Sequence, residues 1–290
     1  MRYVKMHGAG NSFVLVENLN GELGGVSLSA LARFLCDVET GPGADGLIVL
    51  VRAEDDLDFS MLFYNSDGSL GEMCGNGARC AACYGVEHGL STDTARIRFR
   101  ATAGPITARR IASRQYEVRL NLPTVIDLHR TAEADGLAIP CTYVELGSPG
   151  IPHAVTGCTA KELDMAFRAV SETKAPCPLR ERGRQLRHSP AFPKGANVTF
   201  FVRTGESNVR AITFERGVED FTLSCGTGCG ATAVALMLSG QVAGDTLTLQ
   251  MPGGLLTVCV DRQGSAIREL RLTGPVAVTE EGTITVPEFF

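Results

Sequence analysis

The sequence predicts an α+β fold of two pseudo-symmetric domains, each a curled, mostly antiparallel, barrel-like β-sheet around one central α-helix. Two observations predict this fold: the halves of the chain repeat each other, and each half combines many short strands with one helix that carries almost no charge. At 290 residues the chain is long enough for two domains of ordinary size. The predicted domains are residues 1–121 with 274–290, which carry Cys74, and residues 122–273, which carry Cys225.

Three sequence blocks recur in the same order in both halves. They are YVKMHGAG at 3–10 with YVELGSPG at 143–150, CGNG at 74–77 with CGTG at 225–228, and IRFRATAGPITA from Ile97 with LTLQMPGGLLTV from Leu247. The second and third blocks are spaced almost identically in the two halves. A chance match of glycine-rich segments would not produce that agreement, so the repeat favours a duplication.

Most of the regular structure is predicted to be β, because short alternating stretches lie between Gly, Pro, Asn and Asp residues. These stretches are FVLVE, LIVLV, FSMLFY and IRFRA in the first half and VTFFV, AITFE, LTLQM and LTVCV in the second. One amphipathic helix is expected in each half, over Ser27–Asp37 and Lys161–Glu172, with polar residues that can cap its start. Leu122–Pro140 is expected to connect the halves, and strands after about Leu272 to complete the first domain.

A different kind of helix follows each of two cysteines, Cys74 and Cys225. Gly226–Gly240 contains no charged residue, and Gly75–Val86 contains only Arg79. A helix without a polar face must be enclosed on all sides. In a strand-rich half, a sheet curled around the helix is the enclosure that the sequence offers.

Composition limits the partners and the location of the protein. Apolar residues make up 44% of the chain and charged residues 20%, as in ordinary globular proteins. The formal charge of −5 is spread over the chain, so nucleic acid is not an expected partner. No apolar run is long enough to cross a bilayer, and the first residues lack the apolar core of a secretory signal. We therefore expect a cytoplasmic protein with no membrane partner; a homodimer stays open.

The ten cysteines are expected to be reduced thiols, because the chain is too long to need disulfides and shows no export signal. Cys80 and Cys83 have the CxxC spacing of a zinc site. A second pair is missing, and their segment GARCAACYG has the small residues of a packed helix. We expect no metal.

Cys74 and Cys225 each stand just before a glycine-rich helix start, where unpaired N–H groups and the positive end of the helix dipole meet. This position lowers the pKa of a thiol, which predicts a useful thiolate fraction at neutral pH. The same N–H groups can hold a carboxylate. If duplicated domains face each other across a cleft, the two sulfurs would flank one bound molecule, as a two-base epimerase requires. Each cysteine alone could instead be a small buried hydrophobe.

With these residues identified, the chain resembles the diaminopimelate epimerase family over nearly its whole length. Six motifs carry the resemblance: MHGAGNSF (6–13), ADGLIVL (44–50), FYNSDGSLGEMCGNGARC (63–80), IPHAV (151–155), FPKGANVTF (192–200) and TFERGVEDFTLSCGTG (213–228). The resemblance implies the two-domain epimerase fold, which proline racemases and phenazine-type isomerases share. It also implies cofactor-independent conversion of L,L- to meso-diaminopimelate, a precursor of lysine and peptidoglycan, with a small amino-acid substrate and no cofactor.

The resemblance also assigns roles to individual residues. Cys74 and Cys225 would be the acid and the base. The carriers of backbone donors to the reacting carboxylate would be Gly75, Asn76, Gly226 and Thr227. The other substrate-binding positions would be Asn11, Asn65, Asn197, Glu215 and Arg216, and His153 would influence the protonation of the cysteines.

These residues also have purely structural interpretations. The alternatives are a turn at Asn65, strand ends at Asn11 and Asn197, a surface pair at Glu215 and Arg216, and a core residue at His153.

Two departures from the family pattern leave the substrate open. Ile151 stands where many members carry Asn, and Phe221 where they often carry Glu. Both changes are expected near the cleft and would remove polar contacts to the far end of the substrate. A racemase of another amino acid, such as histidine, is therefore the alternative on the same fold. A non-catalytic amino-acid-binding protein is a third reading, which the presence of both cysteines disfavours.

Overall fold

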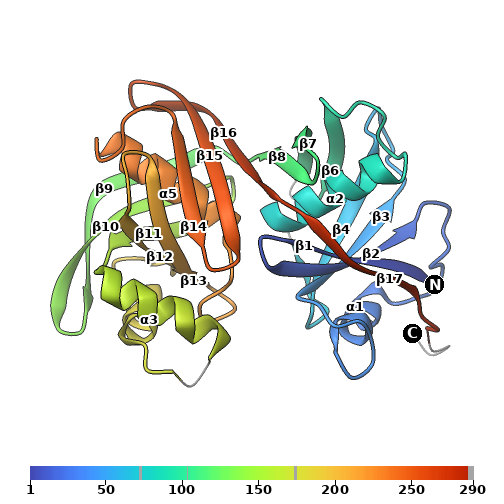
Figure 1. Ribbon diagram of the computed structural model, residues 1–290, viewed down its shortest axis with the longest axis horizontal. Helices are drawn as coiled ribbons and strands as arrows, with labels where there is room; N and C mark the ends of the chain where they lie inside the picture. The colour runs from blue at the N-terminus through green and yellow to red at the C-terminus, as the bar shows by residue number, and fades with distance from the viewer. Residues whose placement is uncertain (72–73, 103, 173–174, 287–290) are drawn as a thin grey trace. The chain divides into compact units, whose positions relative to one another are not determined.

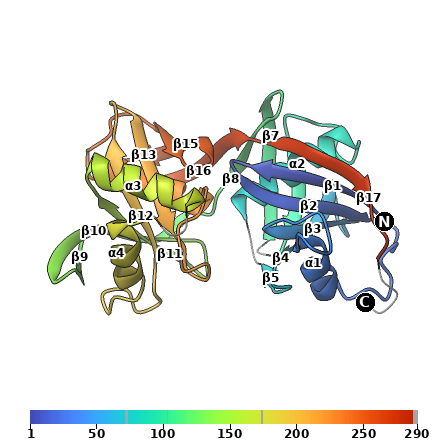
Figure 2. The ribbon, with the colours of Figure 1, turned by 60° about the horizontal axis from the view of Figure 1, so that its bottom comes forward.

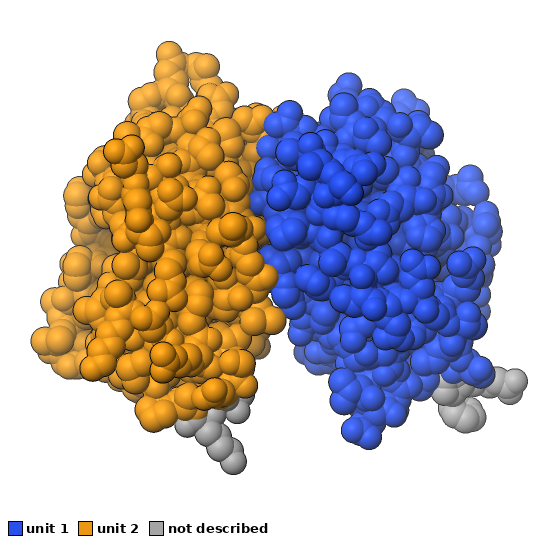
Figure 3. Space-filling model, in the orientation of Figure 1, with its two compact units in different colours: residues 1–118, 273–290 blue, residues 119–272 orange. Residues whose placement is uncertain are grey.

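The computed structural model describes residues 1–71, 74–102, 104–172 and 175–286. The chain divides into two compact units, residues 1–118 with 273–290 and residues 119–272 (Figure 3). Each unit combines a curled sheet with helices, so the predicted α+β class is confirmed. The predicted domain boundaries differ from these units by a few residues and stay a prediction.

The first unit is built on the strand order β17, β1, β2, β3, β4, β6, β7, β8, with the short β5 added to β4. The pairs β2–β3 and β4–β6 are parallel and the others antiparallel. Its elements are β1 (Arg2–Gly8), β2 (Asn11–Asn18), α1 (Leu28–Cys36), β3 (Gly46–Val51), β4 (Phe59–Asn65), β5 (Leu70–Gly71), α2 (Gly75–Glu87), β6 (Ile97–Ala101), β7 (Gly104–Ala112), β8 (Gln115–Arg119) and β17 (Ala277–Thr283).

The second unit follows the strand order β9, β10, β11, β12, β13, β14, β15. Here β11–β12 and β13–β14 are the parallel pairs. Its elements are β9 (Pro123–Ala134), β10 (Leu137–Leu146), β11 (Ile151–Gly157), α3 (Ala160–Ser171), α4 (Pro178–Arg187), β12 (Asn197–Arg203), β13 (Asn208–Phe214), α5 (Gly226–Leu238), β14 (Thr246–Met251), β15 (Gly254–Gln263) and β16 (Ala266–Pro275).

The two units repeat each other element by element. The series β1, β2, α1, β3, β4, α2, β6, β7 corresponds to β10, β11, α3, β12, β13, α5, β14, β15, and both parallel pairs recur at the same places. The C-terminal strand β17 lies beside β1, as β9 lies beside β10. This confirms the pseudo-symmetry of the fold, and β17 belongs to the first unit.

The expectation that Leu122–Pro140 merely connects the halves was wrong, because this stretch forms β9, a turn and the beginning of β10. The turn residues Asp135 and Gly136 both have positive φ, which suits a tight hairpin turn. Pro123 and Pro140 had suggested breaks in regular secondary structure at the two ends of this stretch. Pro123 instead begins the strand, where proline is tolerated, and Pro140 pairs with Thr131 across the hairpin.

The amphipathic helices α1 and α3 form where they were predicted. Ser27 caps α1 by accepting the N–H of Ala30, and Thr159 forms a capping box with Glu162 at the start of α3. Helix α4 was not predicted, because half of its residues are charged. Its signals were Pro178 in the first turn and two buried leucines seven positions apart.

The central helices α2 and α5 are buried along almost their whole length, as their lack of charge predicts. Figure 1 and Figure 2 show each of them running against the strands of its own unit. Small residues make this approach feasible: a Cβ on Gly85 would lie 2.5 Å from the ring of Phe59. Side chains alternate between the two faces of a strand, and α1 and α3 pack on the sheet faces opposite α2 and α5. No helix in the described ranges is long and apolar enough to cross a membrane.

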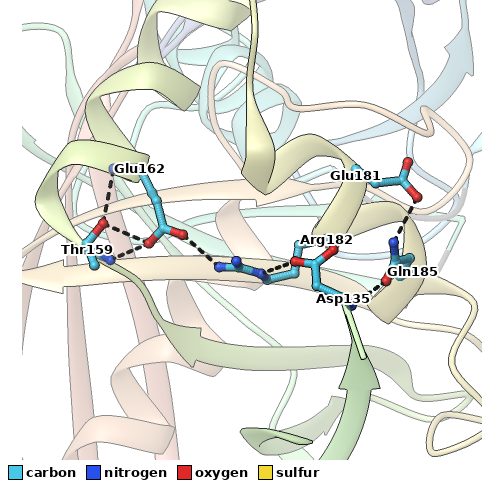
Figure 4. A network of polar contacts seen from close by, with 6 residues as sticks. All are labelled: Asp135, Thr159, Glu162, Glu181, Arg182 and Gln185. Carbon is cyan, nitrogen blue, oxygen red and sulfur yellow. Dashed lines mark hydrogen bonds and ion pairs between the residues drawn. The ribbon is translucent and has the colours of Figure 1, made fainter. Parts of the chain in front are cut away.

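A polar network ties the β9–β10 hairpin to α3 and α4 (Figure 4). Arg182 on α4 bonds Asp135 of the hairpin turn and Glu162 of α3, each at 2.9 Å. The N–H of Asp135 donates to Gln185 at 2.7 Å. Because one guanidinium holds two elements, its contribution should exceed that of an isolated surface pair.

We expect Arg182→Met to lower the free energy of unfolding by about 1 kcal/mol in urea titrations, through the loss of two charge-assisted hydrogen bonds. Arg184→Met is the matched control, because Arg184 pairs only locally with the exposed Glu181. It should leave the unfolding midpoint unchanged. Equal midpoints for the two variants would contradict a bridging role for Arg182.

Candidate active site

Cys74 is the N-cap residue of α2, in extended conformation with φ −131° and ψ 116°. The residues after it, Gly75 and Asn76, are buried in the first helical turn. The thiol of Cys74 donates to Asn11 Oδ1 at 3.6 Å, and Asn76 Nδ2 donates to the same oxygen at 3.3 Å. The predicted residues Asn11, Cys74, Gly75 and Asn76 are therefore together at one helix start.

Asp45, which the sequence analysis did not single out, holds Asn11 from the other side. Its Oδ2 accepts from Asn11 Nδ2 at 2.9 Å, from the N–H of Ser12 at 2.7 Å and from the Ser12 hydroxyl at 3.0 Å. Asp45 is the middle residue of the ADG sequence and directly precedes β3. A charged residue just before a buried strand was the feature of the sequence that could have pointed to it.

Asn65 lies at the end of β4 and is paired with Gly46. Its Nδ2 donates to Ser69 Oγ at 2.9 Å, and its main chain closes the turn with Ser69 and Gly68. The turn role that its sequence context allowed is therefore observed. The neighbouring Ser66 N–H donates to the carbonyl of Asp45, which brings this turn to the same edge as Asn11. A binding role for Asn65 stays a prediction.

Cys225 is the N-cap residue of α5 and accepts the N–H of Gly228 at 3.4 Å. Its sulfur also lies 3.6 Å from the hydroxyl of Thr227. Burial and then the nearby Glu215 carboxyl raise the pKa of the Cys225 thiol well above its usual value, against the opposing hydrogen bonds. The expected lowering of its pKa at the helix start was wrong for this arrangement, because desolvation outweighs the helix dipole.

Glu215 follows directly after β13 and is mostly buried beside Cys225. It accepts the hydroxyl of Thr222 at 2.5 Å. Burial raises the pKa of Glu215, while the hydrogen bonds from Thr222 and Cys225 oppose that shift. Glu215 therefore does not form the surface pair with Arg216 that was its alternative role, since its carboxyl is turned toward the helix start.

Arg216 and Asn197 are connected through the main chain. The N–H of Arg216 donates to Asn197 Oδ1 at 2.8 Å, and Asn197 Nδ2 donates to the carbonyl of Pro152 at 3.3 Å. The guanidinium of Arg216 is exposed and donates to the carbonyl of Lys194 at 3.2 Å. The structure thus brings Asn197, Glu215 and Arg216 to the end of the sheet where α5 and Gly226 begin.

His153 is fully buried in β11, in register with Asn197 of β12. Burial, and then the charge of Arg216, lower its pKa to about 3. Neither ring nitrogen has a hydrogen-bond partner among the described residues. The imidazole is therefore neutral at physiological pH, as the core-residue interpretation requires. Its influence on the cysteines stays a prediction.

The buried His153 should make stability depend on pH. Its folded pKa of about 3 lies below the unfolded value, so the unfolded chain binds more protons between those values. The free energy of unfolding should fall by up to about 1.4 kcal/mol per unit as pH drops below about 6.5. Urea titrations at pH 7 and 5.5 measure this. His153→Gln should lose the slope, whereas a matched change at the exposed His129 should keep it; an unchanged slope in His153→Gln would contradict the assignment.

The two departures from the family pattern differ in their surroundings. Ile151 begins β11 as Asn11 begins β2, so it occupies the corresponding position in the second unit. The expectation that Phe221 lies near a cleft stays a prediction. Its ring packs edge-on against Phe200 and Phe214 at 6.3 and 5.8 Å in the outer core, on the sheet face opposite α5.

Arg79 is the second residue whose place the sequence did not reveal. It is fully buried in α2, and its guanidinium donates to Asn76 Oδ1 at 2.8 Å and to the carbonyl of Gly75 at 3.2 Å. Its signal was visible as the one charge in an otherwise uncharged helix. No cluster of three or more potential metal ligands occurs in the described part of the chain.

Comparisons with known proteins agree with this architecture. The family model described as diaminopimelate epimerase matches residues 3–120 and 163–279. The diaminopimelate epimerase of Aquifex aeolicus (strain VF5) is 34% identical and covers 98% of both chains, and that of Methanothrix thermoacetophila is 36% identical over 89% of this chain and 88% of its own.

Solved structures show the same fold at low sequence identity. A hydroxyproline epimerase from Agrobacterium vitis aligns with a TM-score of 0.70 at 18% identity, covering 100% of this chain and 92% of its own. A phenazine biosynthesis protein of the PhzF family from Bacillus anthracis aligns with a TM-score of 0.73 at 13% identity and 99% coverage of both chains. On the family model and the full-length relatives, the chain belongs to the diaminopimelate epimerase family and is an isomerase.

Proposed function

We propose that this protein interconverts L,L- and meso-diaminopimelate without a cofactor, using Cys74 and Cys225 as its two proton-transferring groups. The observation that carries the proposal is that each cysteine is the N-cap residue of a buried, almost uncharged helix. The family's full-length relatives support the substrate, since those listed above are named for this epimerisation.

The reaction needs one sulfur as thiolate and the other as thiol. The thiolate removes the α-proton from one face of the carbon, and the thiol delivers its proton to the opposite face. The products are the inverted carbon and a protein whose two sulfurs have exchanged protonation states. The reverse reaction uses the same groups in the opposite roles, so both stereoisomers can be substrates.

The helix starts supply the electrostatic help that a weakly acidic α-proton requires. The first-turn N–H groups of Gly75 and Asn76, and those of Gly226 and Thr227, are oriented by their helices toward the cysteine end. We assign them to the α-carboxylate, where negative charge develops as the proton leaves. Asn11, Asn65, Asn197, Glu215 and Arg216 are assigned to the rest of the substrate, whose two ammonium and two carboxylate groups need both acceptors and donors.

The test is exchange of the α-proton in heavy water, followed by proton NMR with L,L-diaminopimelate and, separately, with L-histidine. Loss of the α-proton signal of diaminopimelate, with formation of the meso isomer, is expected. Exchange with histidine and none with diaminopimelate would overturn the substrate assignment. The experiment with histidine is needed because Ile151 stands where many family members carry Asn, at the position that corresponds to Asn11 in the first unit.

We place the enzyme in the cytoplasm, where all ten cysteines would stay reduced thiols. A homodimer remains part of this proposal, to be tested by sedimentation of the purified protein.

A further inference from the structure

The side chain of Asn11 contacts the sulfur of Cys74, and the side chain of Asn76 contacts Asn11. Charged residues determine the orientation of each of these two amides. An amide presents an oxygen that accepts and an NH₂ that donates, and only its partners tell the two apart. The Nδ2 of Asn11 lies 2.9 Å from Asp45 Oδ2. A carboxylate can only accept, so the amide nitrogen must face Asp45 and the amide oxygen must face α2.

The second amide is fixed in the same sense from within α2. Arg79 Nη2 lies 2.8 Å from Asn76 Oδ1, and a guanidinium can only donate. The NH₂ group of Asn76 is therefore turned to Asn11, where it donates to Oδ1 at 3.3 Å. Two charged residues of opposite sign, on different elements, thus impose one consistent orientation.

We propose that Asp45 is a positioning residue that holds the oxygen of Asn11, rather than an N–H group, against the sulfur of Cys74, with Arg79 supporting the arrangement through Asn76. The inference rests on the proposed function only in taking Cys74 as a reacting sulfur. The contact itself, from the Cys74 thiol to Asn11 Oδ1 at 3.6 Å, is a property of the ligand-free protein.

An acceptor facing a thiol stabilises the protonated form and disfavours the thiolate. Asp45 prevents Asn11 from turning its NH₂ to the sulfur, because that would set the amide oxygen against a carboxylate. A thiolate formed in this place is consequently the more basic, which suits the removal of a weakly acidic α-proton. Asp45 thereby sets the strength of the base without touching the substrate.

The other described charged or titratable groups at the start of α2 do not replace Asp45. Arg79 and Cys80 belong to α2 and are fully buried. His7 of β1 uses its Nδ1 to accept the N–H of Gly10 at 3.3 Å. Asp45 is the charged residue that contacts Asn11 directly.

The second unit provides an internal control. At the places that correspond to Asn11 and Arg79 it has Ile151 and Gly230, and the Cys225 sulfur accepts an N–H from Gly228. The Cys74 thiol therefore faces a hydrogen-bond acceptor, whereas the Cys225 sulfur faces a donor. A change confined to Asp45 should alter Cys74 and leave Cys225 unaffected.

The experiment measures alkylation by iodoacetamide across pH, with peptide mass spectrometry following Cys74 and Cys225 separately in the full-length protein. The chains are wild type, Asp45→Asn, Asn11→Ala and the double variant. Asp45 is exposed, so its substitution leaves the core intact. Ser12→Ala serves as the matched control, because it removes both hydrogen bonds between the Ser12 hydroxyl and Asp45 without releasing Asn11.

In Asp45→Asn, the pH midpoint for alkylation of Cys74 should fall by about one unit, because the freed Asn11 amide can turn its NH₂ to the thiolate. The midpoint for Cys225, and that for Cys74 in Ser12→Ala, should stay at the wild-type value. No shift in Asp45→Asn would overturn the proposal. An equal shift in the Asn11→Ala background would also overturn it, since the lost charge alone would then explain the change. No substrate is involved, so these results are independent of the heavy-water exchange test.

Discussion

Replacing either Cys74 or Cys225 by alanine should abolish inversion of diaminopimelate, with a loss of about 10²- to 10⁴-fold or more. Each thiol is assigned to one face of the α-carbon, so its removal leaves that face without its assigned proton donor or acceptor. The measurement is formation of the meso isomer from L,L-diaminopimelate by chiral chromatography, alongside α-proton exchange in heavy water. A circular dichroism melt of each variant confirms that the fold is kept.

Cys158→Ala is the matched control, because this half-buried thiol donates to the carbonyl of Phe201 at 3.7 Å and has no assigned role in the reaction. It should keep wild-type activity. Full inversion by Cys74→Ala or Cys225→Ala would contradict the two-thiol mechanism and favour a binding protein or a different base.

The fold could be predicted because its signals are repeated. The internal duplication, the alternating strands and two helices with almost no charge all pointed to one architecture, and each repeated block reported on the same element twice. Helix α4 escaped prediction because its charge hides a seven-residue leucine spacing. The β9–β10 hairpin escaped because Pro123 and Pro140 suggested an irregular segment, although proline is tolerated where a strand begins.

The site was harder to predict, because sequence shows which residues are present but not which atoms face each other. Asn11 contacts both Cys74 and Asn76, as the sequence could suggest. Asp45 and Arg79, which contact these amides, were visible in the sequence only as a charge before a strand and as the one charge of a helix. The thiol of Cys225 illustrates a second limit. Its position at a helix start predicted a lowered pKa. Burial and the nearby Glu215 carboxyl, which depend on the tertiary structure, raise the pKa instead.

The pseudo-symmetry makes these differences chemically informative. The same backbone arrangement presents Cys74 to the amide of Asn11, and Cys225 to the Glu215 carboxyl and the Thr227 hydroxyl. A symmetric pair of bases would suit a symmetric reaction. Diaminopimelate is inverted at only one of its two stereocentres. The two thiols therefore act on a substrate that is not symmetric about the reacting carbon, and unequal surroundings for them are chemically reasonable.

Restoring the family's acidic residue by Phe221→Glu should destabilise this protein by about 3–5 kcal/mol at pH 7, because the carboxylate would be buried without a charged partner. The ring of Phe221 lies between Phe200 and Phe214, and the site is 7% exposed. Urea titration measures the loss. Phe221→Leu is the matched control, which keeps an apolar side chain and should cost no more than about 1.5 kcal/mol.

The pH dependence of that variant separates burial of charge from loss of packing. The new carboxyl should have a folded pKa above its unfolded value of about 4.3, so its destabilisation grows as pH rises through that window and shrinks toward pH 4. The deficit in Phe221→Leu should not change with pH. A Phe221→Glu protein as stable as wild type at pH 7 would mean that this position opens to solvent. The departure from the family pattern at Phe221 would then bear on the substrate rather than on the aromatic core.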